Sequence, residues 1–181
     1  LMLRYELTPA AAAQAAQDWP AASRLHHATD QPTLLVFVHP HCPCSKASLT
    51  ELNQLVNDIS HPVDLQIVFV RPPDTAEDWE RTSLWDQAQT IPRAKVVTDQ
   101  DGREAALFGG TTSGEALLYN AEGQLLFQGG LTASRGHEGD SAGRSELASL
   151  IDFGGASKDR LPVFGCALNN HCCSDQDAES P

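Results

Sequence analysis

The chain has 181 residues, of which 41% are hydrophobic and 20% are charged, and its formal net charge at pH 7 is −12. This length fits one domain with a hydrophobic core and an additional tail. The twelve Lys and Arg residues form no run, so the chain lacks the basic patch that nucleic-acid binding requires. No stretch reaches the roughly 18 apolar residues that a membrane-spanning helix needs.

Residues 1–32 are predicted to form an N-terminal tether. The segment is rich in Ala and Gln and is interrupted by Pro9, Pro20 and Pro32. Its first residues read like the end of a removed signal or membrane anchor. The five cysteines of the chain favour an oxidising compartment. We therefore expect a periplasmic or other extracytoplasmic location, with the N-terminus as the candidate site of a membrane anchor or of attachment to a membrane complex.

The middle of the chain alternates apolar runs with helical patterns. Continuous apolar, β-branched runs predict buried strands at 33–39, 64–73 and 94–99. Apolar residues spaced by three and four predict a helix between Pro43 and Pro62. Thr75 with Asp78 resembles a capping box that starts a second helix, ending near Gln89.

The last third of the domain has a hairpin pattern and a final helix. A turn and a brief helix are expected within 101–110, followed by two strands that join at Asn120 to Gly123. A last helix is predicted over 141–153. The order of elements predicts an α/β domain with a mixed sheet and helices on both faces.

The stretch VFVHPHCPCSKASLTEL, residues 36 to 52, places two cysteines where a strand gives way to a helix. Unpaired backbone N–H groups and the positive end of the helix dipole favour the thiolate at this place. Cys42 occupies that position, and Cys44 lies within the first helical turn. A disulfide between them would close a small, strained ring, which is typical of labile, catalytic disulfides.

The segment HPHCPCSK, followed by TDQDGREAALFGGTTSGEALLYNAEGQLLFQGG, resembles thioredoxin-fold proteins of the TlpA and AhpC/TSA redoxin type. The stretches WPAAS, TSG and GLTASRGHEGD are similar to the RedB-like bacterial subgroup. The likeness covers about residues 17 to 153. It implies a thioredoxin-like domain over 33–155, with central parallel strands and a terminal antiparallel hairpin, and a cysteine-bearing extension over 156–181.

The resemblance also implies roles for individual residues. Cys42 matches the attacking cysteine of the family, and Lys46 matches the basic residue that usually follows its CxxC motif. Ser45 stands where the second family cysteine belongs, so Cys44 is one residue early and the motif is CxC.

Two further parts of the site follow from the family pattern. The family places a cis-proline before the hairpin, where it contacts the substrate backbone, but this chain reads GGTTSGE there. Thr112 or Ser113 would have to take its place. The hairpin would bring the loop 131–143 near the thiols, where Arg135 or His137 could lower the pKa of the thiolate or transfer a proton.

A metal site is the alternative to a redox pair. His39, His41, Cys42 and Cys44 alternate along the chain, and thiolate with imidazole suits copper or zinc. Copper-delivering thioredoxin-fold proteins of the Sco type use a cysteine pair and one distant His. Their CxxxC spacing is absent here, and no spacing typical of a structural zinc site is present.

Cys166 is open to three interpretations. It could resolve a disulfide of Cys42, form a tail disulfide with Cys172 or Cys173, or bind a metal, and we favour the tail disulfide. The apolar stretch LPVFGCAL around it predicts that the tail docks on the domain. The tail also contains His171, which adds to the metal alternative.

The sequence therefore predicts an extracytoplasmic thiol-disulfide oxidoreductase that acts on a protein thiol or disulfide and needs no diffusible cofactor. The alternative is a copper- or zinc-binding protein, or an accessory or structural subunit of a membrane-associated assembly, with the same fold.

Overall fold

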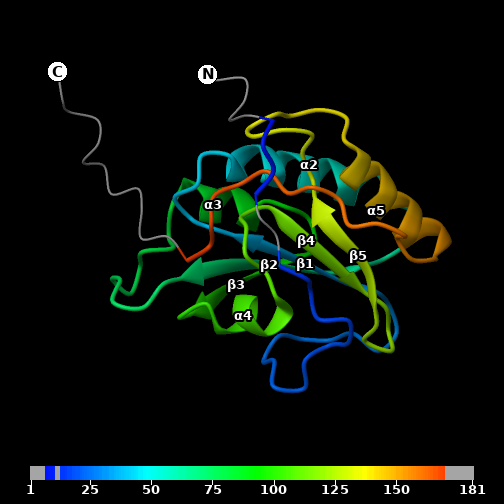
Figure 1. Ribbon diagram of the computed structural model, residues 1–181, viewed down its shortest axis with the longest axis horizontal. Helices are drawn as coiled ribbons and strands as arrows, with labels where there is room; N and C mark the ends of the chain where they lie inside the picture. The colour runs from blue at the N-terminus through cyan, green and yellow to red at the C-terminus, as the bar shows by residue number, and fades with distance from the viewer. Residues whose placement is uncertain (1–6, 11–12, 170–181) are drawn as a thin grey trace.

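The computed structural model describes residues 7–10 and 13–169, which are built around one five-stranded sheet (Figure 1). The strand order is β3-β2-β1-β4-β5, with β1, β2 and β3 parallel and with β4 antiparallel to both β1 and β5. The strands are β1 (Thr33–Val38), β2 (Asp64–Arg71), β3 (Ala94–Gln100), β4 (Glu115–Tyr119) and β5 (Leu125–Gly130). The helices are α2 (Ser45–Asp58), α3 (Ser83–Gln89), α4 (Arg103–Phe108) and α5 (Ala142–Phe153).

Helices cover both faces of the sheet. Helices α2, α3 and α5 pack on one face, and α4 packs on the other face together with part of the N-terminal segment. Side chains of β1 alternate between the two cores: Leu34 and Val36 join the first core, and Leu35 and Phe37 join the second. Because both faces are covered, β1 must be apolar throughout, which explains the continuous run in the sequence. The predicted mixed sheet with helices on both faces is confirmed.

The helix predicted over 75–89 is wrong in its first half, because α3 begins only at Ser83. The hydroxyl of Thr75 donates to a backbone carbonyl three residues earlier, at 2.8 Å, and caps no helix. The carboxylate of Glu80 is buried and accepts a hydrogen bond from Thr98 of β3 at 2.8 Å. This contact holds the segment against the sheet edge, and its backbone forms turns there.

Both ends of the described chain pack along the outer edge of β5. Leu125 N donates to Gln17 O at 2.8 Å, and Ser157 N donates to Leu126 O at 2.7 Å. These bonds cover a sheet edge that would otherwise expose unpaired backbone groups. They also cross the boundaries at which the sequence divides the chain into tether, domain and extension.

Within residues 7–10 and 13–169, no helix has the length and apolar character needed to cross a membrane.

Candidate active site

Cys42 lies in the short turn between the end of β1 and the start of α2. Its backbone N–H donates to His39 O at 3.1 Å, and its carbonyl accepts from Ser45 N at 3.0 Å. These bonds fix the turn so that the thiol points inward, and Cys42 is only 1% exposed. Cys44 is the N-cap of α2 and is half-buried.

The thiol of Cys166 contacts that of Cys42, although 124 residues separate them in the sequence. The two Sγ atoms are 2.8 Å apart, and the described cysteines, Cys42, Cys44 and Cys166, are free thiols. The sequence left Cys166 open between three roles; the contact brings its thiol to Cys42, and its role stays a prediction. Cys172 and Cys173 lie outside the described residues, so the tail disulfide stays a prediction.

Hydrogen bonds shift the ionisation of the three thiols in opposite directions. The thiol of Cys166, and then that of Cys44, donates to Cys42, and together they hold the pKa of Cys42 well below its usual range despite its burial. Donation to Cys42, followed by burial, raises the pKa of Cys44 and the pKa of Cys166. The arrangement therefore favours one thiolate, at Cys42, with protonated thiols beside it.

Arg135 is the loop residue that reaches the thiols. Strand β5 runs parallel to β1, so the loop after β5 enters the edge of the sheet that carries Cys42. The Arg135 guanidinium donates to Gly165 O at 2.6 Å, and its positive charge opposes the increase in the pKa of Cys44 and Cys166. His137 and Lys46 are exposed, and their roles at the site stay predictions.

Thr112 and Ser113 lie in the loop before β4, beside the turn that carries Cys42. Ser113 Oγ accepts from His39 N at 2.8 Å and contacts Ser45 Oγ at 2.6 Å. This pair of hydroxyls is buried and joins the loop to the start of α2. Ser45 thus forms a hydrogen bond with Ser113 that a cysteine at position 45 would form less well, because a thiol is a weak donor and acceptor.

The two histidines of the motif pack around Trp79. The rings of His41 and Trp79 have centroids 4.4 Å apart, and His41 Nε2 lies 3.0 Å from Trp79 O. His39 is buried, and its Nδ1 accepts from His41 N at 3.2 Å. Among the described residues, no group of three or more His, Cys, Asp or Glu side chains is arranged to hold a metal ion. The metal alternative, which also involves the tail beyond residue 169, stays a prediction.

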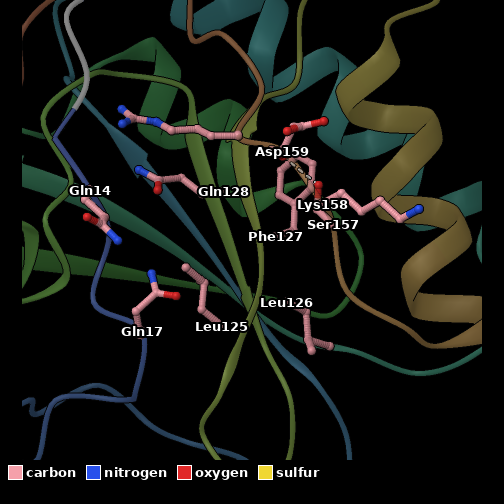
Figure 2. Close-up of a pocket in the computed structure, with 10 residues that line it drawn as sticks. Gln14, Gln17, Leu125, Leu126, Phe127, Gln128, Ser157, Lys158 and Asp159 are labelled. Carbon is pink, nitrogen blue, oxygen red and sulfur yellow. Dashed lines mark hydrogen bonds between the residues drawn. The ribbon is translucent and has the colours of Figure 1, made fainter.

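Two of the cavities on the described surface bear on the position of the site. One, of about 370 Å³, opens beside Cys42 and is lined in part by Pro43, Lys46 and Leu84. The other, of about 400 Å³, lies on β5 between the two terminal segments, with Gln14 and Lys158 on its walls (Figure 2). None of the described residues that line the second cavity is a cysteine or histidine, whereas Cys42 and His41 line the first.

Two solved structures align with most of the chain. An uncharacterized conserved protein from Geobacillus kaustophilus is 16% identical with a TM-score of 0.67, and the alignment covers 93% of this chain and 92% of that one. A hypothetical protein from Sinorhizobium meliloti 1021 is 16% identical with a TM-score of 0.65, covering 90% and 94%. The fold is thioredoxin-like.

Other solved structures align with a smaller part of the chain. A secreted Mycobacterium tuberculosis disulfide oxidoreductase aligns with a TM-score of 0.48 and 18% identity, covering 69% of this chain and 82% of that one. No protein-family model matches the sequence, and no curated protein matches it. The thioredoxin-like fold positions the cysteines, and the function has to be argued from the site itself.

Proposed function

We propose that this protein is an extracytoplasmic thiol-disulfide oxidoreductase in which Cys42 is the attacking thiolate. The convergence of the Cys166 and Cys44 thiols on Cys42 is the observation that carries this proposal. A thiolate at neutral pH is the species that attacks a disulfide, and these donors stabilise it. The CxC motif and the RedB-like stretches of the sequence point to the same activity.

The reaction begins with attack of the Cys42 thiolate on one sulfur of a partner protein's disulfide. An S–S bond forms between Cys42 and the partner, the partner's own S–S bond breaks, and its other sulfur leaves as a thiolate that takes up a proton. A second thiol of this protein then loses its proton and attacks the Cys42 sulfur, which releases the partner's first sulfur. The partner gains two electrons, and this protein ends with an internal disulfide.

The second thiol of the CxC pair, Cys44, is the proposed resolving group. It is the N-cap residue of α2 and donates to Cys42. A separate dithiol protein would have to reduce the internal disulfide for another cycle. The five cysteines and the N-terminal segment support an oxidising location and attachment to a membrane as further parts of the proposal.

Catalysis of disulfide reduction tests this proposal. The assay follows the reduction of insulin disulfides by dithiothreitol with wild-type protein, Cys42→Ser and Cys44→Ser. We expect Cys42→Ser to fall to the uncatalysed rate, because no thiolate remains to attack, and Cys44→Ser to accumulate a disulfide between Cys42 and insulin. The variant Cys172→Ser/Cys173→Ser is the control and should keep its rate. Full activity of Cys42→Ser would refute the proposal.

Native mass spectrometry distinguishes a thiol-disulfide oxidoreductase from a metal-binding protein. Protein purified without reductant or added metal should be lighter by two hydrogen atoms for each disulfide. A copper or zinc adduct that disappears in Cys42→Ser/Cys44→Ser would instead support a metal-binding role.

A further inference from the structure

The segment around Cys166 lies antiparallel to the loop before β4 and joins it through an isolated β-bridge. Ser113 N donates to Cys166 O at 2.8 Å, Leu168 N donates to Thr111 O at 3.0 Å, and an antiparallel bridge joins Thr112 to the residue after Cys166. Backbone bonds of this kind hold an extended peptide whatever its side chains are. The loop therefore offers a general docking edge, and a segment of the same chain occupies it.

The fit is closest at Gly165, immediately before the cysteine. A Cβ atom at Gly165 would lie 1.9 Å from Ser113 O, a backbone atom that cannot move aside cheaply. On its other side, Gly165 O accepts the hydrogen bond from Arg135 at 2.6 Å. An extended peptide can lie on this edge in the observed way only if glycine precedes its cysteine.

The flanking residues fix the register of the segment. Val163, Phe164 and Leu168 are buried, and Ala10 N donates to Val163 O at 2.9 Å. Cys166 is thereby held with its sulfur against Cys42, whose burial leaves little room for a second sulfur at the same point.

We propose that the loop 111–113, together with Cys42, is a docking site for extended peptides that contain Gly-Cys, and that the segment 162–168 is its tethered occupant. This inference rests on the proposed function and names the substrate class of that site. The sulfur of Cys166 stands where the sulfur of a partner's disulfide would stand during attack. A partner peptide has to displace the segment before it reacts.

Displacement of the segment 162–168 also identifies Cys44 as the thiol that resolves the mixed disulfide. When a partner cysteine takes the place of Cys166, the Cys42 thiolate attacks it, and the bond between this cysteine and its former disulfide partner breaks. Cys166 has then left the site, whereas Cys44 stays beside Cys42 at the N-cap of α2. Cys44 gives up its proton and attacks Cys42, and the partner cysteine leaves as a thiolate. The partner gains the two electrons that Cys42 and Cys44 lose.

Two peptide probes test the inference. Both carry the sequence of residues 161–169, LPVFGCALN, with the cysteine as a mixed disulfide with thionitrobenzoate, and one has Ala in place of the Gly. Attack by Cys42 on the peptide sulfur releases thionitrobenzoate, which is followed by its absorbance. The proteins are wild type, Gly165→Ala, which should expel the segment and keeps every thiol, and Ala156→Ser, a control at an exposed position outside the segment. All three carry Cys172→Ser/Cys173→Ser.

We expect Gly165→Ala to react with the Gly peptide about tenfold faster than wild type, because the segment no longer competes with the peptide for the loop. A tenfold change corresponds to about 1.4 kcal/mol. The Ala156→Ser control should match wild type. Both wild type and Gly165→Ala should prefer the Gly peptide to the Ala peptide about tenfold. The preference of the wild-type protein needs no substitution and so does not depend on the folding of a variant.

The small reagent dithio-bis-nitrobenzoate separates failure of this inference from failure of the proposed function. If Cys42 reacts with the small disulfide but attacks both peptides equally fast, the docking site is refuted and the oxidoreductase proposal stands. If Cys42 reacts with none of the three disulfides in folded Gly165→Ala, both proposals are refuted.

Discussion

Replacing Cys166 by Ala is expected to raise the pKa of the Cys42 thiol by about 1–2 pH units. Donation from Cys166 is the largest of the effects that lower this pKa. A hydrogen bond to a charged group contributes about 1.5–3 kcal/mol, and one pKa unit corresponds to about 1.36 kcal/mol. Because the donor stabilises the thiolate and not the thiol, its removal shifts ionisation to higher pH.

The change in pKa is measured by the ultraviolet absorbance of the thiolate during a pH titration of reduced protein. A background with Cys172→Ser/Cys173→Ser leaves only the three described thiols, of which Cys42 ionises first. Cys166→Ser is the matched control, because its hydroxyl can still donate, and it should shift the pKa less than Cys166→Ala does. An unchanged first ionisation step in Cys166→Ala would show that Cys166 does not stabilise the thiolate.

Replacing Arg144 by Leu is expected to lower the free energy of unfolding by about 3–5 kcal/mol, the usual cost of leaving a buried charge without its partner. The carboxylate of Glu51, on α2, is completely buried, and its Oε2 lies 2.8 Å from the Arg144 guanidinium of α5. Its Oε1 accepts from Gly139 N at 2.5 Å. The pair therefore joins α2, α5 and the loop that carries Arg135.

Chemical denaturation under reducing conditions measures the loss. The double variant Glu51→Leu/Arg144→Leu is the comparison, because it removes both charges, and we expect it to recover much of the stability. Arg103→Leu, at an exposed arginine outside this pair, is a control that should change stability little. If Arg144→Leu is as stable as wild type, the ion pair does not hold these elements together.

The strands and their order along the chain could be predicted, because the residues that cause each strand lie within the strand itself. A strand covered on both faces has to be apolar at every position, and β1 and β2 show this directly. The hairpin turn is equally local: Gly123 has φ +83, which glycine adopts without strain. Both features can be recognised in a few consecutive residues.

The parts that could not be predicted depend on long-range contacts. Thr75 and Asp78 have the spacing of a capping box, but the burial of Glu80 against β3 decides the conformation of that segment. The contact between Cys42 and Cys166 depends on where a segment without helix or strand crosses the sheet edge. Only the apolar stretch around Cys166 signalled that it would dock.

The site is assembled from four separate parts of the chain. The turn before α2 supplies Cys42 and Cys44, and the loop before β4 supplies the backbone edge at Ser113. The loop after β5 brings Arg135, and the C-terminal segment brings Cys166. All four parts lie outside the helices and strands, which explains why these elements alone do not predict the chemistry.

Mapping the disulfide that forms at Cys42 tests the central claim most directly. Reduced Cys172→Ser/Cys173→Ser protein is treated with one equivalent of oxidised glutathione, digested with trypsin and analysed by mass spectrometry. Cleavage after Arg24 and Lys46 leaves Cys42 and Cys44 in one peptide, and cleavage after Arg160 leaves Cys166 in another. A Cys42–Cys44 disulfide therefore stays within one peptide, whereas a Cys42–Cys166 disulfide links two.

We predict that Cys42 is oxidised in every disulfide found, within its own peptide or linked to Cys166, and that Cys42→Ser forms none of them. Oxidation that leaves Cys42 as a free thiol, or an unchanged yield of disulfide in Cys42→Ser, would contradict the assignment of Cys42 as the attacking group.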